Sequence, residues 1–239
     1  MIGLVCSVIK EASGLINHIK KRKFFQYFNI EIISGLINNK NIILVISGVG
    51  KVNAAHATTF LILKYKPEVI INFGIAGAFP GSGVSIGDIA IAQREIYADE
   101  GIYMTRGFSD MRFIGIPLLK NSNGKALYNE LVFNERLLVS VMNSLQKKGH
   151  LVKKGNFITV STITATKDRA DYLRKRFSPI CESMEGAAVA HVCLKQGVNN
   201  FLEIRGISNF VGPRDKKAWD INAAVTGTER AVLDILEAL

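Results

Sequence analysis

Short apolar runs rich in β-branched residues alternate with helical patterns along almost the whole chain. We expect strands at 2–7, 30–34, 42–47, 69–73, 88–96, 157–161 and 201–208, and helices at 10–20, 51–65, 133–147, 167–177, 184–195 and 225–239. Strands that alternate with helices predict an α/β fold with a largely parallel or mixed central sheet. No repeat, biased segment or Pro/Gly/Ser-rich linker interrupts this order, so we expect one domain over residues 1–239.

The composition excludes several classes of protein. Hydrophobic residues make up 48% of the chain, which is too many for a disordered protein. No stretch approaches the run of about 20 apolar residues that a membrane-spanning helix needs. The three cysteines have no paired spacing, which argues against a disulfide framework. We therefore expect a globular protein of the cytoplasm.

The excess of basic residues is the one unusual property of the composition. The chain has 30 Lys and Arg against 20 Asp and Glu, a formal net charge of +10, which suits nucleic acid, an anionic membrane or an anionic small substrate. The basic runs at 18–23, 146–154 and 174–176 lack the interleaved aromatic side chains of a nucleic-acid platform. We expect these runs to be solvated surfaces, and we expect neither a nucleic-acid nor a membrane partner.

Glycine-rich turns follow two of the expected strands, at 47–50 and 73–77. Neither turn matches the P-loop or the dinucleotide-binding pattern, and a tight turn after a strand is a sufficient reason for each. Cys181, His191 and Cys193 do not have the spacing of a structural zinc site. We therefore predict no metal and no cofactor.

Three polar residues lie at the ends of expected strands, where ligands bind in α/β sheets. Glu11 follows the first strand, Glu185 enters a helix among small residues, and Asn209 follows the strand at 201–208. Both carboxylates could simply favour the positive end of a helix, and Asn209 could form a turn. Alternatively, Glu11 is a general base for water, Glu185 binds a ribose diol, and Asn209 reads a base edge with one donor and one acceptor. Glu182 is expected to face the solvent.

Six stretches, taken in order and spacing, resemble the nucleoside phosphorylase/nucleosidase superfamily over almost the whole chain. These stretches are 2–11, 47–55, 66–77, 87–89, 183–193 and 205–209. Within the superfamily the chain is most similar to the futalosine hydrolases, at 159–166, 182–190 and 207–215, with Trp219 and Asp220 behind the last of these. Futalosine hydrolases release hypoxanthine from futalosine in the menaquinone pathway.

The resemblance implies a three-layer α/β/α fold around a mixed sheet, and a homodimer or higher homo-oligomer in which a neighbour can complete the pocket. It also assigns roles residue by residue. By that assignment the water-activating glutamate is Glu11, the ribose binders are Met184 and Glu185, the residue facing the purine N7 edge is Asn209, the arginine supporting its loop is Arg205, and the backbone bordering the base lies at Ile163 and Thr164.

Two positions where this chain departs from the phosphorylases favour water as the nucleophile. Phosphate-binding members of the superfamily place an arginine and a serine where this chain has Asn72 and Ile75. Ile75 cannot hydrogen-bond phosphate and Asn72 carries no charge, so charge-assisted bonds of about 1.5–3 kcal/mol each are lost. The methylthioadenosine-type nucleosidases have serine in place of Ile75, near the catalytic water, so the second contact of that water is unassigned.

Asn209 marks a second departure, because adenine-releasing nucleosidases have aspartate there. The asparagine NH₂ can donate to a 6-oxo group, and its carbonyl can accept the proton that N7 gains as the base leaves. The same NH₂ placed against an adenine amino group leaves both donors unpaired, a mismatch of about 10²–10⁵ in discrimination. The residue therefore favours a 6-oxopurine nucleoside such as futalosine or inosine.

The 5′ side of futalosine carries an aromatic carboxylate. The irregular segment 99–125 offers Arg106 and Phe108 as an aromatic and cationic pocket for it, and Arg214 is another candidate, although a loop arginine is more often solvated. The alternatives are a methylthioadenosine/S-adenosylhomocysteine nucleosidase, which would have aspartate at 209, and a purine nucleoside phosphorylase. A basic nucleoside- or RNA-binding protein without catalysis would not need Glu11.

Overall fold

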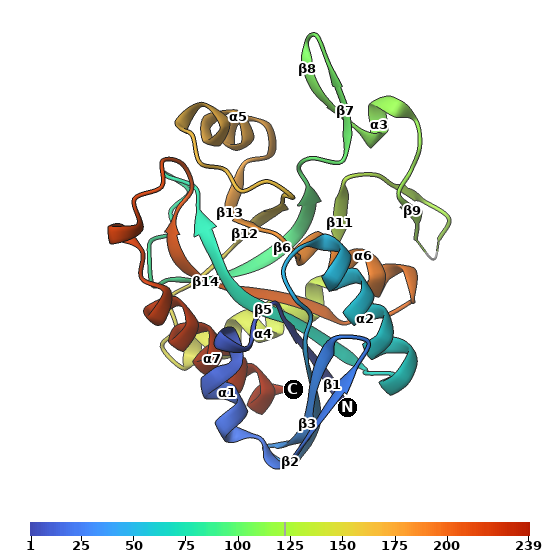
Figure 1. The fold of residues 1–239 in the computed structure, drawn as a ribbon, viewed down its shortest axis with the longest axis vertical. Coiled ribbons are helices and arrows are strands. Elements are labelled where there is room, and N and C mark those ends of the chain that lie inside the picture. The colour runs from blue at the N-terminus through green and yellow to red at the C-terminus, as the bar shows by residue number, and fades with distance from the viewer. Residues whose placement is uncertain (122) are drawn as a thin grey trace.

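A mixed β-sheet between two layers of helices forms the fold, which confirms the predicted three-layer α/β/α architecture (Figure 1). The computed structural model describes residues 1–121 and 123–239, and residue 122, within the segment 99–125, lies outside the described residues. The main sheet contains β1 (Ile2–Cys6), β2 (Lys20–Tyr27), β3 (Ile30–Ile37), β4 (Lys40–Ile46), β5 (Val69–Ala78), β6 (Ile89–Tyr97), β11 (Glu130–Val132), β12 (Val152–Thr159), β13 (Pro179–Ser183) and β14 (Phe201–Phe210).

The strand order places β1, β5 and β14, which carry or precede candidate site residues, close together. The order is β11-β6-β12-β13-β5-β1-β4-β3-β2, and β14 pairs in parallel with β5 and antiparallel with β6. The strands β6, β12, β13, β5 and β14 therefore form a closed ring of pairings. β1 and β14 each pair in parallel with β5, so the carboxyl ends of these three strands lie at one edge of the sheet.

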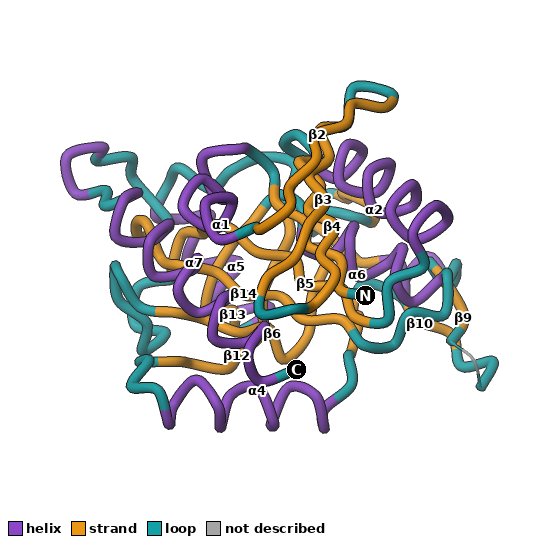
Figure 2. Tube along the Cα trace, turned by 90° about the horizontal axis from the view of Figure 1, so that it is seen from below, coloured by secondary structure: helices purple, strands orange, loops and turns teal. Residues whose placement is uncertain are grey.

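Helices cover both faces of the sheet and enclose a separate hydrophobic cluster on each face. They are α1 (Ser13–His18), α2 (Lys51–Tyr65), α4 (Glu135–Lys147), α5 (Lys167–Phe177), α6 (Gly186–Lys195) and α7 (Ile221–Ala238). Figure 2 shows α1 and α7 on one side of the strands and α2 on the other. Along β1, Leu4 belongs to the cluster under α1, α4 and α7, and the next residue, Val5, to the cluster under α2 and α6. This alternation is the two-residue period of a strand that is buried on both faces.

Capping side chains set the start of several helices. Asp220 accepts a hydrogen bond from the Ala223 N–H at 2.8 Å, as the sequence predicts for the C-terminal helix. Thr166 caps α5 and Asn134 caps α4 in the same way. Gly197, with φ of +77°, follows α6, where a left-handed residue closes a helix without strain.

Three strands of the main sheet, β2, β11 and β13, and a hairpin are not predicted from the sequence. β2 runs through part of the basic stretch 18–23, and all eight of its residues are exposed, so it has no apolar alternation to reveal it. β13 is a short strand between α5 and α6. The irregular segment holds the hairpin of β7 (Gly101–Met104) and β8 (Gly107–Asp110), then α3 (Met111–Ile114) and β9 (Leu119–Lys120), and β10 (Ala126–Leu127) follows it. The hairpin projects from the top of Figure 1.

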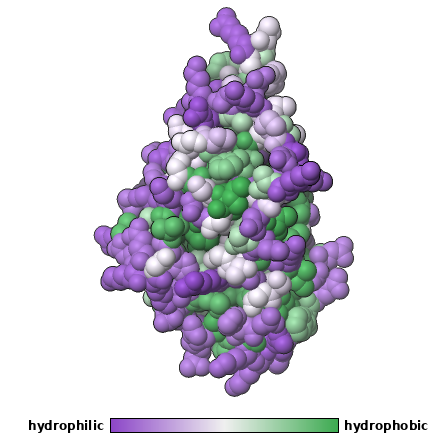
Figure 3. All heavy atoms as spheres, turned by 90° about the vertical axis from the view of Figure 1, so that its left-hand side faces the viewer, coloured by the Kyte–Doolittle hydropathy of each residue, from purple (hydrophilic) through white to green (hydrophobic). Residues whose placement is uncertain are grey.

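On the face drawn in Figure 3, hydrophilic residues occupy most of the outline, and hydrophobic residues gather towards the middle. No helix in residues 1–121 and 123–239 combines the length and the apolar character needed to cross a membrane. The three cysteines, Cys6, Cys181 and Cys193, are buried and unpaired, and burial raises the pKa of each thiol.

Candidate active site

A cavity of about 290 Å³ lies where the carboxyl ends of β1, β5 and β14 meet the end of β13. Its volume is close to the lower end of the range for small-molecule sites. Eight of the residues singled out from the sequence line it: Glu11, Ile75, Ile163, Thr164, Met184, Glu185, Asn209 and Arg214. Residues that are far apart along the chain therefore line one cavity.

Glu11 is fixed in the cavity wall by four hydrogen bonds. Its Oε2 accepts from the Ser7 hydroxyl at 2.7 Å, the Ser7 N–H at 3.0 Å and the Val8 N–H at 3.2 Å. Within the part of the chain that the structure describes, its Oε1 accepts a single hydrogen bond, from the Ile75 N–H at 2.9 Å. Three donors occupy Oε2, so Oε1 is the oxygen with a lone pair left for a proton from water. Glu11 is also an acid in the first turn of the short 3₁₀ helix Ile9–Ala12, as in the alternative interpretation, and its bond to the Val8 N–H caps that helix. Its further bonds to Ser7 and to Ile75 of β5 go beyond that capping role.

Gly74 makes room for this carboxylate. A Cβ at position 74 would overlap Oε1 of Glu11 and lie 2.8 Å from Nη1 of Arg205, and the φ of Gly74 is +156°. Gly74 lies within β5 and not in a turn, which corrects the turn predicted at 73–77, and a glycine is needed there for the close approach to Glu11.

We expect Gly74→Ala to lower kcat by about 10²-fold, because a displacement of about 1 Å in a reacting group is sufficient for a loss of that size. The three atoms nearest to the added Cβ all belong to the side-chain ends of Glu11 and Arg205, so we expect the variant to fold, with lower stability than wild type. Gly149→Ala is a matched control, because Gly149 also has a positive φ but a Cβ there would have no atom within 4 Å. Steady-state kinetics and thermal unfolding of both variants test this expectation. Equal kcat values in the two variants would contradict it.

Glu185 and Met184 line the cavity immediately before α6. Glu185 is the N-cap residue of α6, but its side chain makes no capping bond. Its Oε1 accepts instead from the Gly50 N–H at 2.8 Å, so the glycine turn at 47–50 positions this carboxylate. Burial raises the pKa of Glu185, while Arg205 and the Gly50 N–H partly offset this effect. One oxygen is therefore free to accept from a ligand.

Asn209 enters the cavity from β14, just after an irregularity in the pairing with β5 that lies between Ile207 and Asn209. The Ser208 hydroxyl lies 2.9 Å from Oδ1 of Asn209, and Nδ2 of Asn209 donates to the Phe210 carbonyl at 2.9 Å. These contacts orient the amide and leave one N–H and one lone pair for a ligand.

Glu182 is also part of the cavity wall, which corrects the expectation that it faces the solvent. The residue is only 6% exposed. Its Oε1 accepts from the Thr164 N–H at 2.9 Å and its Oε2 from the Thr164 hydroxyl at 2.6 Å. Burial raises the pKa of Glu182, and the Thr164 bonds and nearby Arg169 act against that rise. The signal that could have revealed it is the short run Pro179–Ser183, which forms the unpredicted strand β13.

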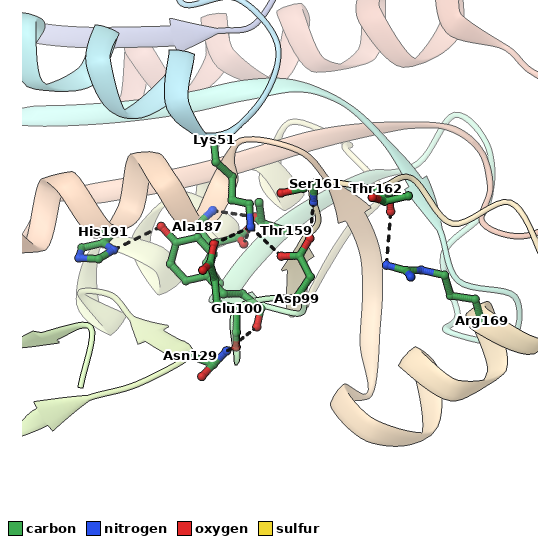
Figure 4. Close-up of polar contacts among 12 residues, drawn as sticks. Lys51, Asp99, Glu100, Asn129, Thr159, Ser161, Thr162, Arg169, Ala187 and His191 are labelled. Atoms are coloured by element: carbon green, nitrogen blue, oxygen red, sulfur yellow. Dashed lines mark hydrogen bonds and ion pairs between the residues drawn. The ribbon is translucent and has the colours of Figure 1, made fainter. Parts of the chain in front are cut away.

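Contacts with neighbouring elements hold the loop that carries Ile163 and Thr164. Figure 4 shows Asp99 between Lys51 and Ser161: its Oδ1 lies 2.6 Å from the Lys51 ammonium, and its Oδ2 accepts from the Ser161 N–H. Arg169 of α5 reaches the Thr162 carbonyl at 3.5 Å and the Thr164 hydroxyl at 3.3 Å. The loop is therefore tied to α2, β6 and α5.

A buried polar cluster lies behind the carboxylates of the cavity. Arg205 is 1% exposed and does not line the cavity; its Nη2 and Nε lie 2.8 and 2.9 Å from Oε1 of Glu203. Burial alone would lower the pKa of Arg205, but Glu203, Glu185 and Glu11 raise it, so the guanidinium stays charged. Burial and the adjacent Glu203 raise the pKa of Glu95 well above its usual range. One charged arginine is thus placed to balance the surrounding carboxylates, and its support of the loop that carries Asn209 stays a prediction.

The residues considered for an anionic 5′ group lie in different places. Arg214 is exposed at the cavity, and its guanidinium lies 4.8 Å from the centre of the Trp219 ring. Arg106 is exposed in the β7–β8 hairpin, and Phe108 packs there against the Arg176 guanidinium at 5.2 Å. The hairpin residues do not line the cavity of their own chain, so their contact with a substrate stays a prediction.

Asn72 and Ile75, the positions considered for phosphate, differ in their access to the cavity. Ile75 lines it, whereas Asn72 is 1% exposed within β5 and is not part of the lining. Within the described ranges, no group of three or more His, Cys, Asp and Glu residues is arranged to hold a metal ion. The absence of metal and cofactor therefore stays a prediction.

Comparison with known proteins places this geometry in context. A family model described as the phosphorylase superfamily matches residues 1–239. The chain is 34% identical to a futalosine hydrolase of Thermus thermophilus over 190 residues, 80% of this chain and 79% of that protein. It is 30% identical to a 5′-methylthioadenosine/S-adenosylhomocysteine nucleosidase of Actinobacillus succinogenes over 209 residues, 87% and 85% of the two chains. The solved structure of a futalosine hydrolase mutant of Helicobacter pylori superposes with a TM-score of 0.86 at 21% identity, covering 100% and 99% of the two chains.

Proposed function

The chain belongs to the phosphorylase superfamily, and from this we propose that it is a nucleosidase that hydrolyses the N-glycosidic bond of a 6-oxopurine nucleoside, with futalosine as the substrate. The observation that carries the proposal is the meeting of Glu11, Glu185 and Asn209 in one cavity. A base for water, an acceptor pair for ribose hydroxyls and a reader of the purine edge are the three groups that this reaction needs.

In the proposed reaction, the bond between C1′ and N9 breaks and its electron pair leaves with the purine, through a transition state with oxocarbenium character. Glu185 accepts hydrogen bonds from the ribose hydroxyls. N7 of the leaving purine takes a proton from solvent, and the carbonyl oxygen of Asn209 accepts a hydrogen bond from the resulting N7–H. A water molecule attacks C1′ and gives its proton to Oε1 of Glu11, the oxygen with a single protein donor. The rigid bonding of Oε2 keeps that carboxylate in place for the transfer.

Water is preferred to phosphate in this proposal because the cavity offers no built phosphate cradle at the relevant positions. Ile75 presents an aliphatic side chain, and its N–H already donates to Glu11. Asn72 is buried away from the cavity. An anion placed near Glu11, Glu182 and Glu185 would also be repelled by three carboxylates.

A second candidate comes from the relatives, several of which are 5′-methylthioadenosine/S-adenosylhomocysteine nucleosidases. Asn209 favours the 6-oxopurine over this candidate. The NH₂ of its amide would face the 6-amino group of adenine, and two donors cannot satisfy each other.

The test is an assay of the purified protein with futalosine, inosine and 5′-methylthioadenosine, each with and without phosphate, in which the released base and sugar are identified by chromatography. We expect hypoxanthine from futalosine in phosphate-free buffer. Release of adenine alone would support the second candidate, and a requirement for phosphate would indicate a phosphorylase. Absence of any released base would favour a binding protein.

A further inference from the structure

Glu182 is a buried carboxylate in the cavity that the proposed hydrolysis does not use. Its two hydrogen bonds come from one residue, Thr164, and each takes one lone pair of one oxygen. Each oxygen therefore keeps a second lone pair. A carboxylate that is 6% exposed and lines a ligand cavity needs a partner for this remaining capacity, or it is buried at a cost.

The sheet register places Glu182 opposite Asn209. Gly77 of β5 pairs with Glu182 of β13 on one side and with Asn209 of β14 on the other. Neighbouring strands lie about 4.8 Å apart, so the two backbones are separated by about 10 Å with a glycine between them. Both side chains line the same cavity, and a Cβ on Gly77 would lie 3.1 Å from Nδ2 of Asn209. Because Gly77 has no side chain, the space between the Glu182 carboxylate and the Asn209 amide stays open.

A 6-oxopurine matches this pair of side chains along its edge. It presents N1–H as a donor, O6 as an acceptor and N7 as an acceptor until the base is protonated. An amide can serve O6 and N7, while a carboxylate can only accept, as N1–H requires. Adenine has a lone pair at N1 in place of the N–H, and this lone pair would face the carboxylate. The same carboxylate would accept from guanine, which also carries N1–H.

We propose that Glu182 is a specificity-determining residue, which accepts a hydrogen bond from N1–H of a 6-oxopurine while Asn209 reads the O6 and N7 side. The inference rests on the proposed function, because it concerns the same cavity and the same base. A purely structural alternative is that Glu182 only anchors Thr164, whose loop is also held by Arg169 and Asp99. If Glu182 binds N1–H, replacing the N1 hydrogen should weaken binding of the base; if Glu182 only anchors Thr164, Glu182 should contribute nothing to that effect.

The primary test measures binding of two free bases to the whole wild-type protein by calorimetry. We expect hypoxanthine to bind about 10²-fold or more tightly than 1-methylhypoxanthine, in which a methyl group replaces the N1 hydrogen. Glu182→Gln should weaken hypoxanthine binding at least tenfold and reduce the preference to a few-fold. Arg169→Met is the control for anchoring: it removes the bonds that hold Thr162 and Thr164 but keeps the Glu182 carboxylate, and Arg169 does not line the cavity, so this variant should retain the preference.

Equal binding of the two bases to wild type, or no binding of hypoxanthine, would overturn the proposal. So would an unchanged preference in Glu182→Gln, because the methyl group would then be rejected by other atoms. The wild-type comparison remains decisive even if a variant does not fold. Hydrolysis of inosine and 1-methylinosine, measured in parallel, separates the two proposals. If both nucleosides are hydrolysed equally well, the role of Glu182 is wrong but the proposed reaction stands. If hypoxanthine binds more tightly than 1-methylhypoxanthine but no nucleoside is hydrolysed, the proposed reaction is wrong and the role of Glu182 stands.

Discussion

Replacing Glu11 with glutamine is expected to lower kcat by about 10²-fold or more, because an amide cannot take a proton from the attacking water. The hydrogen bonds around this residue make the expectation specific. Four donors converge on Glu11, from Ser7, Val8 and Ile75, and an amide has only one acceptor oxygen. The NH₂ of glutamine must therefore face a backbone N–H, which we expect to cost about 1–3 kcal/mol of stability.

That cost is smaller than the 5–15 kcal/mol by which a domain is typically stable, so Glu11→Gln should still fold. The measurement is kcat with futalosine, together with thermal unfolding to show that the variant is native. Glu31→Gln is the matched control, since Glu31 is exposed on β3, and we expect wild-type kinetics from it. Near-normal kcat in a folded Glu11→Gln protein would rule out Glu11 as the base for water.

Local sequence signals predict the helices and strands whose ends carry a capping residue or a proline. The helices at 51–65 and 167–177 are confirmed to the residue, and Pro67 and the cap Thr166 lie at their boundaries. The predicted strand at 69–73 is confirmed but too short, because β5 continues to Ala78 through two glycines. That extension comes from pairing with β14, a contact between residues more than 120 positions apart, and no local pattern contains it.

The candidate site likewise contains residues that local sequence signals identify and one that they do not. Glu11, Glu185 and Asn209 are identifiable because each interrupts an apolar or small-residue stretch at the end of an element, and the structure brings all three together. Glu182 is missed because Cys181, Glu182 and Ser183 are all buried. β13 is paired on both sides, with β12 and β5, so the alternation of buried and exposed residues that marks a surface strand is lost.

The largest expected change in specificity is at Asn209. In the structure, Nδ2 donates to the Phe210 carbonyl and Oδ1 lies near the Ser208 hydroxyl, so the amide has a defined orientation towards the cavity. Asn209→Asp removes the donor: its ionised carboxylate would face the Phe210 carbonyl, and protonation relieves that repulsion. The protonated carboxyl can donate to N7 and accept from a 6-amino group, whereas its oxygen would oppose a 6-oxo group.

We therefore expect Asn209→Asp to lower kcat/KM for a 6-oxopurine nucleoside relative to a 6-aminopurine nucleoside by about 10²-fold or more, since a mismatch between fixed polar groups discriminates by about 10²–10⁵. The measurement is the ratio of kcat/KM for inosine and 5′-methylthioadenosine. Asn41→Asp, at an exposed position of β4, makes the same chemical change away from the cavity and should leave the ratio as in wild type. An unchanged ratio in Asn209→Asp would show that the amide does not read the base. The preference would then have to come from the other side of the ring, where Glu182 lines the cavity.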